Sequence, residues 1–404
     1  MQVRRRRICF VQIADQILPD FHALFRGEVK IDAKPKAELL CPIDGERIAL
    51  KPEELPVLAS LSAEEWVEAE ALMSQGLADK ALLVRMAERQ VLLTDAPDDV
   101  ASQRIMTAEK RMEDIGWYDL TAMYHAMTRW SNKTDDVSDR EHSDAAHRSR
   151  LDEVAKRHGP PPTHFPRRDD AIATEPLDLP AFDSPLAEIL KARRTARNFA
   201  SHVPLPRHEL SHMLYGTFGA MGTQEFAPGM VAVKRTSASG GGLTPMDAYP
   251  LIMNVEGLRT GIYHYEAGTH SLELLKEVPE QSLRAMVMQV TAGQDYFAQA
   301  QAAIVHVARF ARHHWKYRRH AKAYKALLMD SAHLSQTFYL LATERGLGAF
   351  YTAALNDVEL TPWLGLDPIE AAPVGMSGVG ITTEDPHDEL HFCPQPYDPT
   401  AARR

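Results

Sequence analysis

Residues 303–346, with the sequence AIVHVARFARHHWKYRRHAKAYKALLMDSAHLSQTFYLLATERG, decide how the second half of the chain folds. The apolar run from Ala303 to Phe310 predicts a buried β-strand. The apolar periodicity from Ala321 to Arg345 predicts a long α-helix that ends at Gly346, because glycine is the residue type that most often terminates helices. A basic, aromatic segment joins the two elements.

The neighbouring sequence predicts a mixed sheet accompanied by long helices. Strands are expected at Tyr249–Val255, Gly261–Tyr265, Ser271–Leu275 and near Pro373–Val379. Helices are expected at Glu280–Ala302 and from Pro185, capped by Ser184, into the arginines near Arg193. No G-x-G-x-x-G sequence follows a strand, so nothing indicates a Rossmann dinucleotide site. The predicted fold class is α+β, as a three-layer sandwich over residues 181–404.

The N-terminal part is predicted to form a separate small module over residues 1–95. Strands at Arg5–Ile13, Ala37–Leu50 and Ala81–Met86, with helices at Lys51–Ser60 and Ala63–Gly76, indicate a winged-helix-like domain. Such modules often hold another chain by β-addition. Residues 96–180 are expected to be a helical and charged linker region, because Thr134–Asp170 carries sixteen charged residues and one aromatic.

Composition limits the function classes. A chain of 404 residues with 45% hydrophobic and 25% charged side chains predicts a soluble globular protein with two or more cores. A net charge of -10 argues against a nucleic-acid partner, and no apolar stretch approaches the roughly 20 residues of a membrane-spanning helix. The Arg4–Arg7 run is expected to be a solvated strand end at a sheet edge. Cys9, Cys41 and Cys393 lie far apart, which favours a reducing, cytoplasmic location.

Residues 191–199, KARRTARNF, form the first candidate site. On a helix end, Arg193, Arg194 and Arg197 would converge on one face with the Thr195 hydroxyl beside them. Guanidinium groups bind phosphate oxygens in a bidentate way, so the cluster predicts a phosphate site. The alternative is a basic last turn that complements the helix dipole.

Residues 235–242 form the second candidate site. Arg235, Ser237 and Ser239 precede the glycines Gly240, Gly241 and Gly242. Because glycine has no Cβ, the backbone amides and hydroxyls of this loop can approach a flat, polar ligand closely. The alternative is a flexible turn before the next strand.

The third candidate site is Lys316–Tyr317, which places an ammonium beside a phenol. Both groups can act as general acid or base when they are buried. The alternative is a basic, aromatic surface loop. The nearby His313, His314 and His320 lack the spacing of metal ligands, so no metal site is expected. His333 is expected to be a hydrogen-bonded core histidine.

In this order these segments resemble the flavin-dependent, nitroreductase-like dehydrogenases of the SagB type, which oxidise azolines to azoles in ribosomally made peptides. More narrowly, they resemble the peptide maturation dehydrogenases. The resemblance covers about Phe182 to Gly380. It rests on RRTARNF, TSASGGGLTPMDAYP, GLRTGIYHYEAGTHSLELL, WKYRRHAKAYKALLMDSAHLSQ, and GLGAFYTAALND ahead of WLGLD. YHAMTRW at 124–130 resembles the stretch that precedes the catalytic domain in these proteins.

The resemblance implies a nitroreductase-like fold with FMN as cofactor. The FMN phosphate and ribityl chain would be clasped by Arg193, Arg194, Thr195 and Arg197. The isoalloxazine edge would be lined by Ser237, Ser239, Gly240 and Gly241, with Arg235 nearby. The backbone at Ala353 and Ala354 would face the N5 side of the ring, where many relatives carry a glycine instead.

The resemblance also implies the reaction and the partners. One of Lys316 and Tyr317 would take a proton from the azoline ring carbon while FMN accepts the hydride. The substrate would be a precursor peptide, with a cyclodehydratase or another maturation enzyme as a further partner, and the protein would be a homodimer with FMN at the subunit interface. Two other classes stay open: an NAD(P)H-dependent flavin reductase of nitroaromatics, quinones or dehydroamino acids, and a non-catalytic peptide-binding partner.

Overall fold

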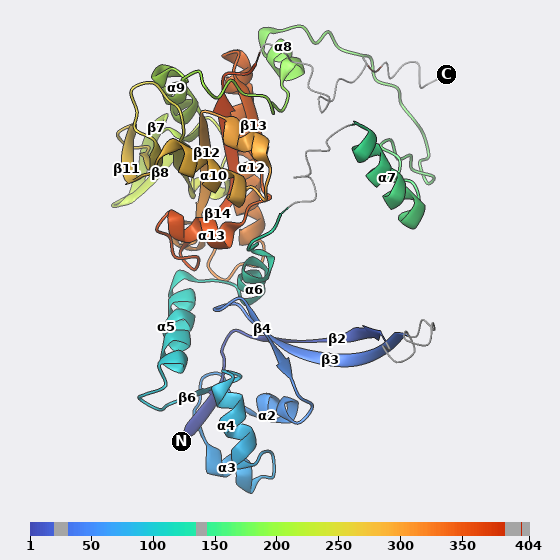
Figure 1. Ribbon diagram of the computed structural model, residues 1–404, viewed down its shortest axis with the longest axis vertical. Helices are drawn as coiled ribbons and strands as arrows, with labels where there is room; N and C mark the ends of the chain where they lie inside the picture. Colours follow the sequence, from blue (N-terminus) through green and yellow to red (C-terminus); the bar gives the residue numbers. More distant parts are fainter. Residues whose placement is uncertain (20–30, 135–143, 384–396, 398–404) are drawn as a thin grey trace. The chain divides into compact units, whose positions relative to one another are not determined.

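The computed structural model describes residues 1–19, 31–134, 144–383 and 397, so the predicted free Cys393 lies outside the described residues. The chain divides into two compact units, which are described separately (Figure 1). The first unit comprises Met1–Arg129, Arg309–Leu327 and Asp367–Ala371, and the second comprises Trp130–Ala308, Leu328–Leu366 and Ala372–Arg404. The first unit therefore extends past the predicted boundary at residue 95 and includes two segments from the C-terminal half. None of the helices in the described residues has both the length and the apolar character needed to cross a lipid bilayer.

The second unit is built on a six-stranded sheet with the strand order β11-β10-β9-β12-β14-β13. The strands are β9 (Met246–Ile252), β10 (Gly261–Glu266), β11 (Ser271–Glu277), β12 (Ala302–Arg309), β13 (Gly348–Thr352) and β14 (Ala371–Gly380). The β9/β10, β9/β12, β10/β11 and β13/β14 pairs are antiparallel. The strands predicted in this half are confirmed, and β13 joins them at one edge.

Helices accompany this sheet, which confirms the predicted α+β class. They are α7 (Asp144–His158), α8 (Pro185–Ala192), α9 (Arg207–Phe218), α10 (Glu280–Val290), α12 (Ala323–Glu344) and α13 (Asp357–Trp363). A separate two-stranded sheet is formed by β7 (Gly222–Ala227) and β8 (Met230–Lys234). Helices α9 and α12 lie side by side, because a Cβ on Gly216 would meet the side chain of Leu341 at 2.7 Å. As predicted, Ser184 caps α8. Gly346, which has φ +69°, follows α12, also as predicted.

The predicted helix Glu280–Ala302 is wrong in its second half. Helix α10 ends at Val290, and the backbone then takes positive φ values at Ala292 (56°) and Gly293 (83°). Two successive residues in the left-handed region cannot continue a right-handed helix. A short 3-10 helix, Asp295–Gln299, follows before β12 begins.

The first unit contains two three-stranded sheets. One has the order β5-β1-β6 and the other β2-β3-β4. The strands are β1 (Gln2–Arg5), β2 (Phe10–Pro19), β3 (Ile31–Cys41), β4 (Glu46–Leu50), β5 (Val67–Glu68) and β6 (Leu92–Thr94). The helices are α2 (Glu54–Ser60), α3 (Ala69–Ser74), α4 (Lys80–Glu88), α5 (Val100–Ile115), α6 (Asp119–Thr128) and α11 (Phe310–His314). A hydrophobic core formed by residues between Val3 and Leu92 includes Val3, Leu39, Val57, Leu83 and Met86.

The predicted strand Ala81–Met86 is instead helix α4. Asp79 caps this helix, since its side chain accepts a hydrogen bond from the backbone N–H of Leu82 at 2.6 Å. Leu82, Leu83 and Met86 are all buried, and a spacing of three and four residues places them on one helical face. A short apolar run alone does not distinguish a helix from a strand, so the capping aspartate was the missed signal.

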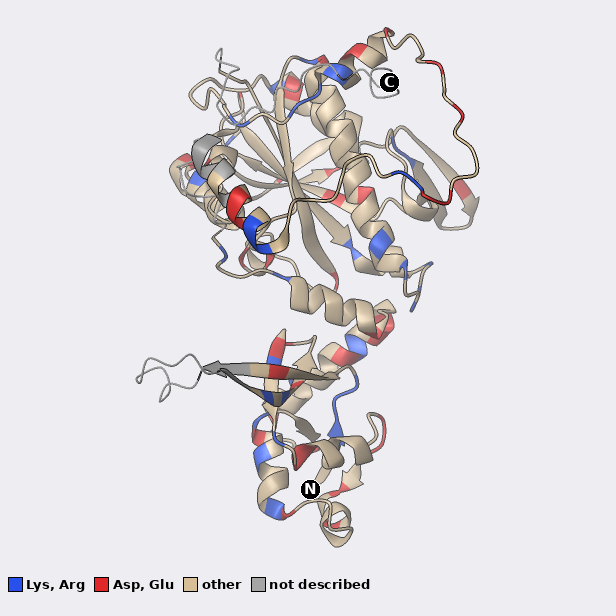
Figure 2. Ribbon diagram, turned by 90° about the vertical axis from the view of Figure 1, so that its right-hand side faces the viewer, with Lys and Arg blue, Asp and Glu red and all other residues tan. Residues whose placement is uncertain are grey.

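The expectation of a solvated Arg4–Arg7 run is also wrong. Strand β1 is the central strand of its sheet, so it has no edge to protect. Arg6 is only 1% exposed and pairs with Asp44 at 2.6 Å. Arg4 pairs with the buried Glu109 at 3.2 Å. Basic and acidic residues are interspersed along the helices and strands of this unit (Figure 2), and these arginines have carboxylate partners that the local sequence does not reveal.

Protonation of His306 is expected to couple stability to pH. This histidine of β12 is fully buried, its ring nitrogens lie 3.0 Å from the hydroxyls of Ser331 and Ser377, and burial lowers its pKa to about 3. The unfolded chain therefore binds one more proton than the folded chain between about pH 6.5 and pH 3, so stability falls as pH falls, by about 1.4 kcal/mol per pH unit. The free energy of unfolding can be measured with urea at pH values from 7 to 4. Its dependence on pH should be less steep for His306→Asn than for the wild type, by the equivalent of one bound proton. An unchanged slope contradicts this account.

Candidate functional site

The arginine segment that follows α8 is not helical. Arg193 has φ -54° and ψ 126°, and none of the residues from Arg193 to Asn198 is helical. The predicted convergence of three guanidiniums on a helix end is therefore wrong. Contacts with two tyrosines group Arg193, Thr195 and Arg197. Arg194, by contrast, is exposed.

Two tyrosines hold the grouped residues in place. The guanidinium of Arg193 lies 5.3 Å from the centre of the Tyr339 ring, and the hydroxyls of Thr195 and Tyr339 are 3.0 Å apart. The guanidinium of Arg197 lies 5.8 Å from the centre of the Tyr296 ring. Planar guanidiniums stacked on rings keep their N–H groups at the rim. Arg193, Thr195 and Arg197 are thus oriented donors suited to a phosphate.

The glycine loop is fixed to α12 by one buried carboxylate. Asp330 is 3% exposed and accepts hydrogen bonds from the Ser239 hydroxyl at 2.6 Å and from the Gly240 backbone N–H at 2.9 Å. The next two residues, Gly241 and Gly242, have φ values of 64° and 69°, which favour glycine. The polar groups of Ser239 and Gly240 are therefore used to shape the loop. Sequence reasoning missed Asp330, whose partners are 90 and 91 residues away.

The remaining loop residues also contact α12 or β9. The hydroxyls of Ser237 and Thr337 are 2.6 Å apart, and Arg235 donates to the carbonyl of Met246 at 2.8 Å. His333 lies 3.0 Å from the carbonyl of Ala238 through Nδ1. The prediction of a core histidine is wrong, because His333 is exposed, although it is hydrogen-bonded as expected.

The space between this loop and α12 is small. It measures about 10 Å³ and is lined by Arg235, Ser237, Ala238, Ser239, Thr244, Met246, Asp330 and Leu334. Small-molecule pockets measure roughly 300 Å³ or more, so a flat ligand cannot enter this space. A Cβ on Gly242 would meet nothing within 4 Å, so the outer side of the loop is open. The oriented cations and the open glycine surface fit a flat ligand that carries a phosphate and lies on this surface.

Ala353 and Ala354 follow strand β13 directly. The backbone N–H of Ala354 donates to the Thr352 hydroxyl at 3.0 Å. At the other end of the same strand, Ala349 accepts a hydrogen bond from the backbone N–H of Ala196 at 2.8 Å. β13 therefore connects the arginine segment to the Ala353–Ala354 turn. Along the strand, Ala349 and Ala353 are about 13 Å apart, at about 3.3 Å per residue.

Lys316 and Tyr317 belong to the first unit, within the segment Arg309–Leu327. The Lys316 ammonium lies 5.7 Å from the centre of the Tyr317 ring, so the two groups are neighbours as predicted. Lys316 is exposed and Tyr317 is half-buried. A single chain therefore leaves the Lys316–Tyr317 pair accessible to solvent. Among the described residues, no group of three or more His, Cys, Asp or Glu side chains is arranged to hold a metal ion.

An aromatic cluster anchors both ends of the segment that carries this pair. The ring of Trp117 packs on Phe310 with centroids 4.4 Å apart and on His314 at 4.8 Å. His125 Nδ1 lies 3.0 Å from the hydroxyl of Tyr324. Burial lowers the pKa of His125 to about 3 and that of His314 to about 4, so both are neutral at physiological pH. The YHAMTRW stretch thus contributes His125 to the support of the Lys316–Tyr317 segment, a role that sequence alone did not indicate.

Comparisons with known proteins match a large part of the chain. Residues 190–381 match the family described as the nitroreductase family. A protein of Methanocaldococcus jannaschii, named "Putative nitroreductase", is 28% identical over 207 residues, which are 50% of this chain and 96% of that protein. A chain of the E. coli microcin synthetase McbBCD complex with truncated pro-MccB17 bound has a TM-score of 0.50 at 18% identity, covering 68% of this chain and 94% of that chain. A Ralstonia eutropha JMP134 structure, also named a putative nitroreductase, has a TM-score of 0.39 at 24% identity, with coverages of 52% and 88%.

The family match covers the elements that carry most of the candidate site. The family match begins within α8 and ends just after β14, so it includes the arginine segment, the glycine loop and β13. At identities below 25%, likeness to solved structures shows the fold alone. The mixed helices and sheets of the second unit form a nitroreductase-like α+β fold.

Proposed function

We propose that the protein is an FMN-dependent oxidoreductase. The observation that supports this most is the joint attachment of the Arg193–Arg197 segment and the Gly240–Gly242 loop to helix α12, within a nitroreductase-like fold. The first supplies cations for a phosphate and the second an open, flat surface. FMN carries both a phosphate and a flat ring, so one ligand satisfies both features.

In this proposal, different residues hold the phosphate end and the ring of the cofactor. Arg193, Thr195 and Arg197 hold the phosphate and ribityl chain, and Arg194 stays a predicted ligand from the resemblance. The ring lies against the loop of Arg235, Ser237, Ser239, Gly240 and Gly241, with the backbone at Ala353 and Ala354 beside its N5 edge. When bound, FMN supplies the acceptor for a hydride.

We infer further that the substrate is a ribosomally made peptide carrying an azoline ring, which is oxidised to an azole. This reaction removes one proton and one hydride from the ring. The base in this step is one of Lys316 and Tyr317 in its deprotonated form, which takes the proton from the ring carbon. Support comes from the adjacency of the two groups and from the aromatic anchors at both ends of their segment. The similarity of the motifs to azoline dehydrogenases supplies the substrate class.

A second copy of the chain completes the site in this proposal. The cavity behind the glycine loop is only about 10 Å³, so one chain offers the flavin ring a surface and no enclosure. A homodimer with FMN at the subunit interface supplies the missing cover. The winged-helix-like module at residues 1–95 holds the precursor peptide, and a cyclodehydratase that forms the azoline is a further partner.

The experiment has two steps. The purified full chain should show flavin absorption near 450 nm that persists through gel filtration or returns when FMN is added; a colourless protein that rejects FMN contradicts the whole proposal. The flavin-loaded protein is then mixed with a thiazoline-containing peptide, and mass spectrometry should report the loss of two hydrogens. Flavin-dependent reduction of a nitroaromatic by NADH without peptide oxidation would favour the reductase alternative.

A further inference from the structure

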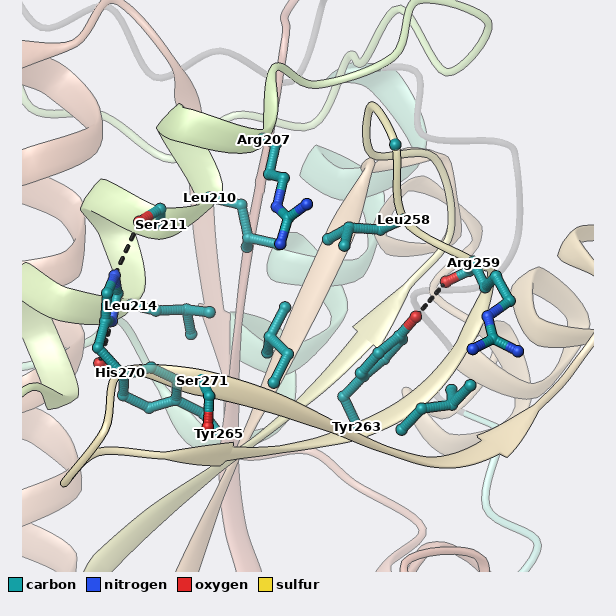
Figure 3. A pocket seen from close by; sticks show the side chains of 13 residues that line it. Arg207, Leu210, Ser211, Leu214, Leu258, Arg259, Tyr263, Tyr265, His270 and Ser271 are labelled. Carbon is teal, nitrogen blue, oxygen red and sulfur yellow. Dashed lines mark hydrogen bonds between the residues drawn. The ribbon is translucent and has the colours of Figure 1, made fainter.

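A second cavity lies on the other edge of the sheet, between helix α9 and the β10–β11 hairpin (Figure 3). Its volume is about 470 Å³, within the range of small-molecule pockets. It shares no lining residue with the arginine segment or the glycine loop. The function proposed above leaves this cavity without a role.

Four leucines form the apolar part of the cavity wall. Leu210 and Leu214 of α9 are each 1% exposed and form one wall, while Leu272 and Leu274 of β11 are half-buried and form another. The four leucines come from two elements, α9 and β11, that both line the cavity. Such a lining favours a ligand with an apolar chain, because burial of apolar surface contributes about 25 cal/mol per Å².

Two arginines lie at the rim of this cavity. In Figure 3 Arg207 reaches from α9 over the leucines, and Arg259 stands beyond Leu258. Within the described part of the chain, no carboxylate lies at ion-pair distance from Arg207, whereas Arg259 pairs with the exposed Glu277 at 3.3 Å. Arg207 is therefore the cation that a ligand would neutralise. A basic rim on a chain of net charge -10 selects an anion.

Three hydrogen-bonded side chains, Ser211, His270 and Tyr265, form the other end of the cavity. His270 Nε2 lies 2.8 Å from the Ser211 hydroxyl and His270 Nδ1 lies 2.7 Å from the Tyr265 hydroxyl. Burial raises the pKa of Tyr265 to about 12, so the phenol keeps its proton at neutral pH. The Ser211 hydroxyl lines the cavity and can both donate and accept hydrogen bonds, so it is within reach of a ligand there.

The backbone at His270 adopts an uncommon conformation. His270 has φ +51°, in the left-handed region where glycine or asparagine is preferred at a hairpin turn. Such conformations persist only where surrounding contacts fix them, and they concentrate at ligand sites. Here the two hydrogen bonds of the imidazole fix it.

We propose that this cavity binds an amphipathic organic anion, with its carboxylate on Arg207 and its apolar chain over Leu210, Leu214, Leu272 and Leu274. Two sources share this chemistry: a free carboxylic acid with an aliphatic chain, and the C-terminal carboxylate of a peptide that ends in an aliphatic residue. The Ser211 hydroxyl donates to a polar group further along the same ligand.

Isothermal titration calorimetry on the full chain tests the proposal. The probes are octanoate, octan-1-ol as its uncharged counterpart, and a synthetic tetrapeptide ending in leucine as free acid and as amide. The wild type should bind octanoate or the free-acid peptide with a dissociation constant below about 1 mM. Arg207→Gln should weaken binding by about tenfold or more, because hydrogen bonds to charged groups contribute this much. Leu274→Trp, which fills the cavity, should also weaken it.

Lys276→Gln is the matched control. It removes one positive charge from the exposed part of β11 but does not line the cavity, so its affinity should equal that of the wild type. Binding of octanoate identifies the free acid as the source, and binding of the free-acid peptide alone identifies a peptide terminus. If Leu274→Trp fails to fold, the exposed Arg207→Gln carries the test. Absence of binding by both acids, or equal affinity of Arg207→Gln and the wild type, overturns the proposal.

Discussion

Replacement of Arg193 or Arg197 by glutamine is expected to weaken FMN binding by about tenfold to a hundredfold each. A hydrogen bond to a charged group contributes about 1.5–3 kcal/mol, and each 1.4 kcal/mol corresponds to a factor of ten in affinity. Both guanidiniums are held over tyrosine rings at 5.3 and 5.8 Å, so they are already oriented when a phosphate arrives. Quenching of FMN fluorescence on titration with the apoprotein measures the dissociation constant.

Two variants serve as comparisons for this effect. Lys191→Gln removes the same charge two residues before Arg193, but its ammonium pairs with Glu188 at 2.7 Å on the surface, so FMN affinity should not change. Arg194→Gln should have a smaller effect than Arg193→Gln, because Arg194 is exposed whereas Arg193 is held over the Tyr339 ring. Equal affinities for the Arg193→Gln and Lys191→Gln proteins would exclude the phosphate role of Arg193.

Local signals in the sequence predicted the ends of elements well. The start of α8 follows from Ser184, whose hydroxyl accepts a hydrogen bond from the Ala187 N–H at 3.2 Å, and from the proline at its first position. The end of α12 follows from Gly346, with φ +69°. In both cases the physical cause lies within four residues of the boundary, so sequence contains it.

The same reasoning failed where the cause lies far away in the chain. Nothing in the Arg193–Arg197 sequence ends a helix, and its non-helical path is fixed by tertiary contacts with Tyr339 and with the carbonyl of Ala349. Asp330 looks like an ordinary polar residue of a long helix, yet it fixes a loop some 90 residues earlier. Residue types therefore indicated the candidate site, but its geometry comes from pairings that no local pattern encodes.

The Arg4–Arg7 run shows the same limit for charge. Four consecutive arginines are usually solvated, and the run gives no hint that Asp44 and Glu109 neutralise two of them inside the first unit. Those carboxylates are 38 and 105 residues away in sequence. Burial of a charge depends on its partner, so composition alone cannot decide it.

Replacement of Lys316 by glutamine, or of Tyr317 by phenylalanine, is expected to leave FMN bound and to slow peptide oxidation by about a hundredfold or more. General acid–base catalysis contributes typically 10²–10⁴-fold to a rate, and the residue that takes the proton from the azoline carbon supplies this factor. Neither residue belongs to the arginine segment or the glycine loop, so both variants should still bind FMN. Mass spectrometry of a thiazoline peptide under single-turnover conditions measures the rate.

Lys322→Gln is the matched control, because Lys322 is an exposed lysine of the same segment, six residues from Lys316, and its removal should leave the rate unchanged. Comparison of the two active-site variants then separates their roles. If only one of them loses the rate, that residue is the base and its neighbour positions it, since the Lys316 ammonium lies 5.7 Å from the centre of the Tyr317 ring. If both keep the full rate while FMN stays bound, neither residue transfers the proton, and the pair belongs to an exposed basic loop whose aromatic anchors serve only the fold of the first unit.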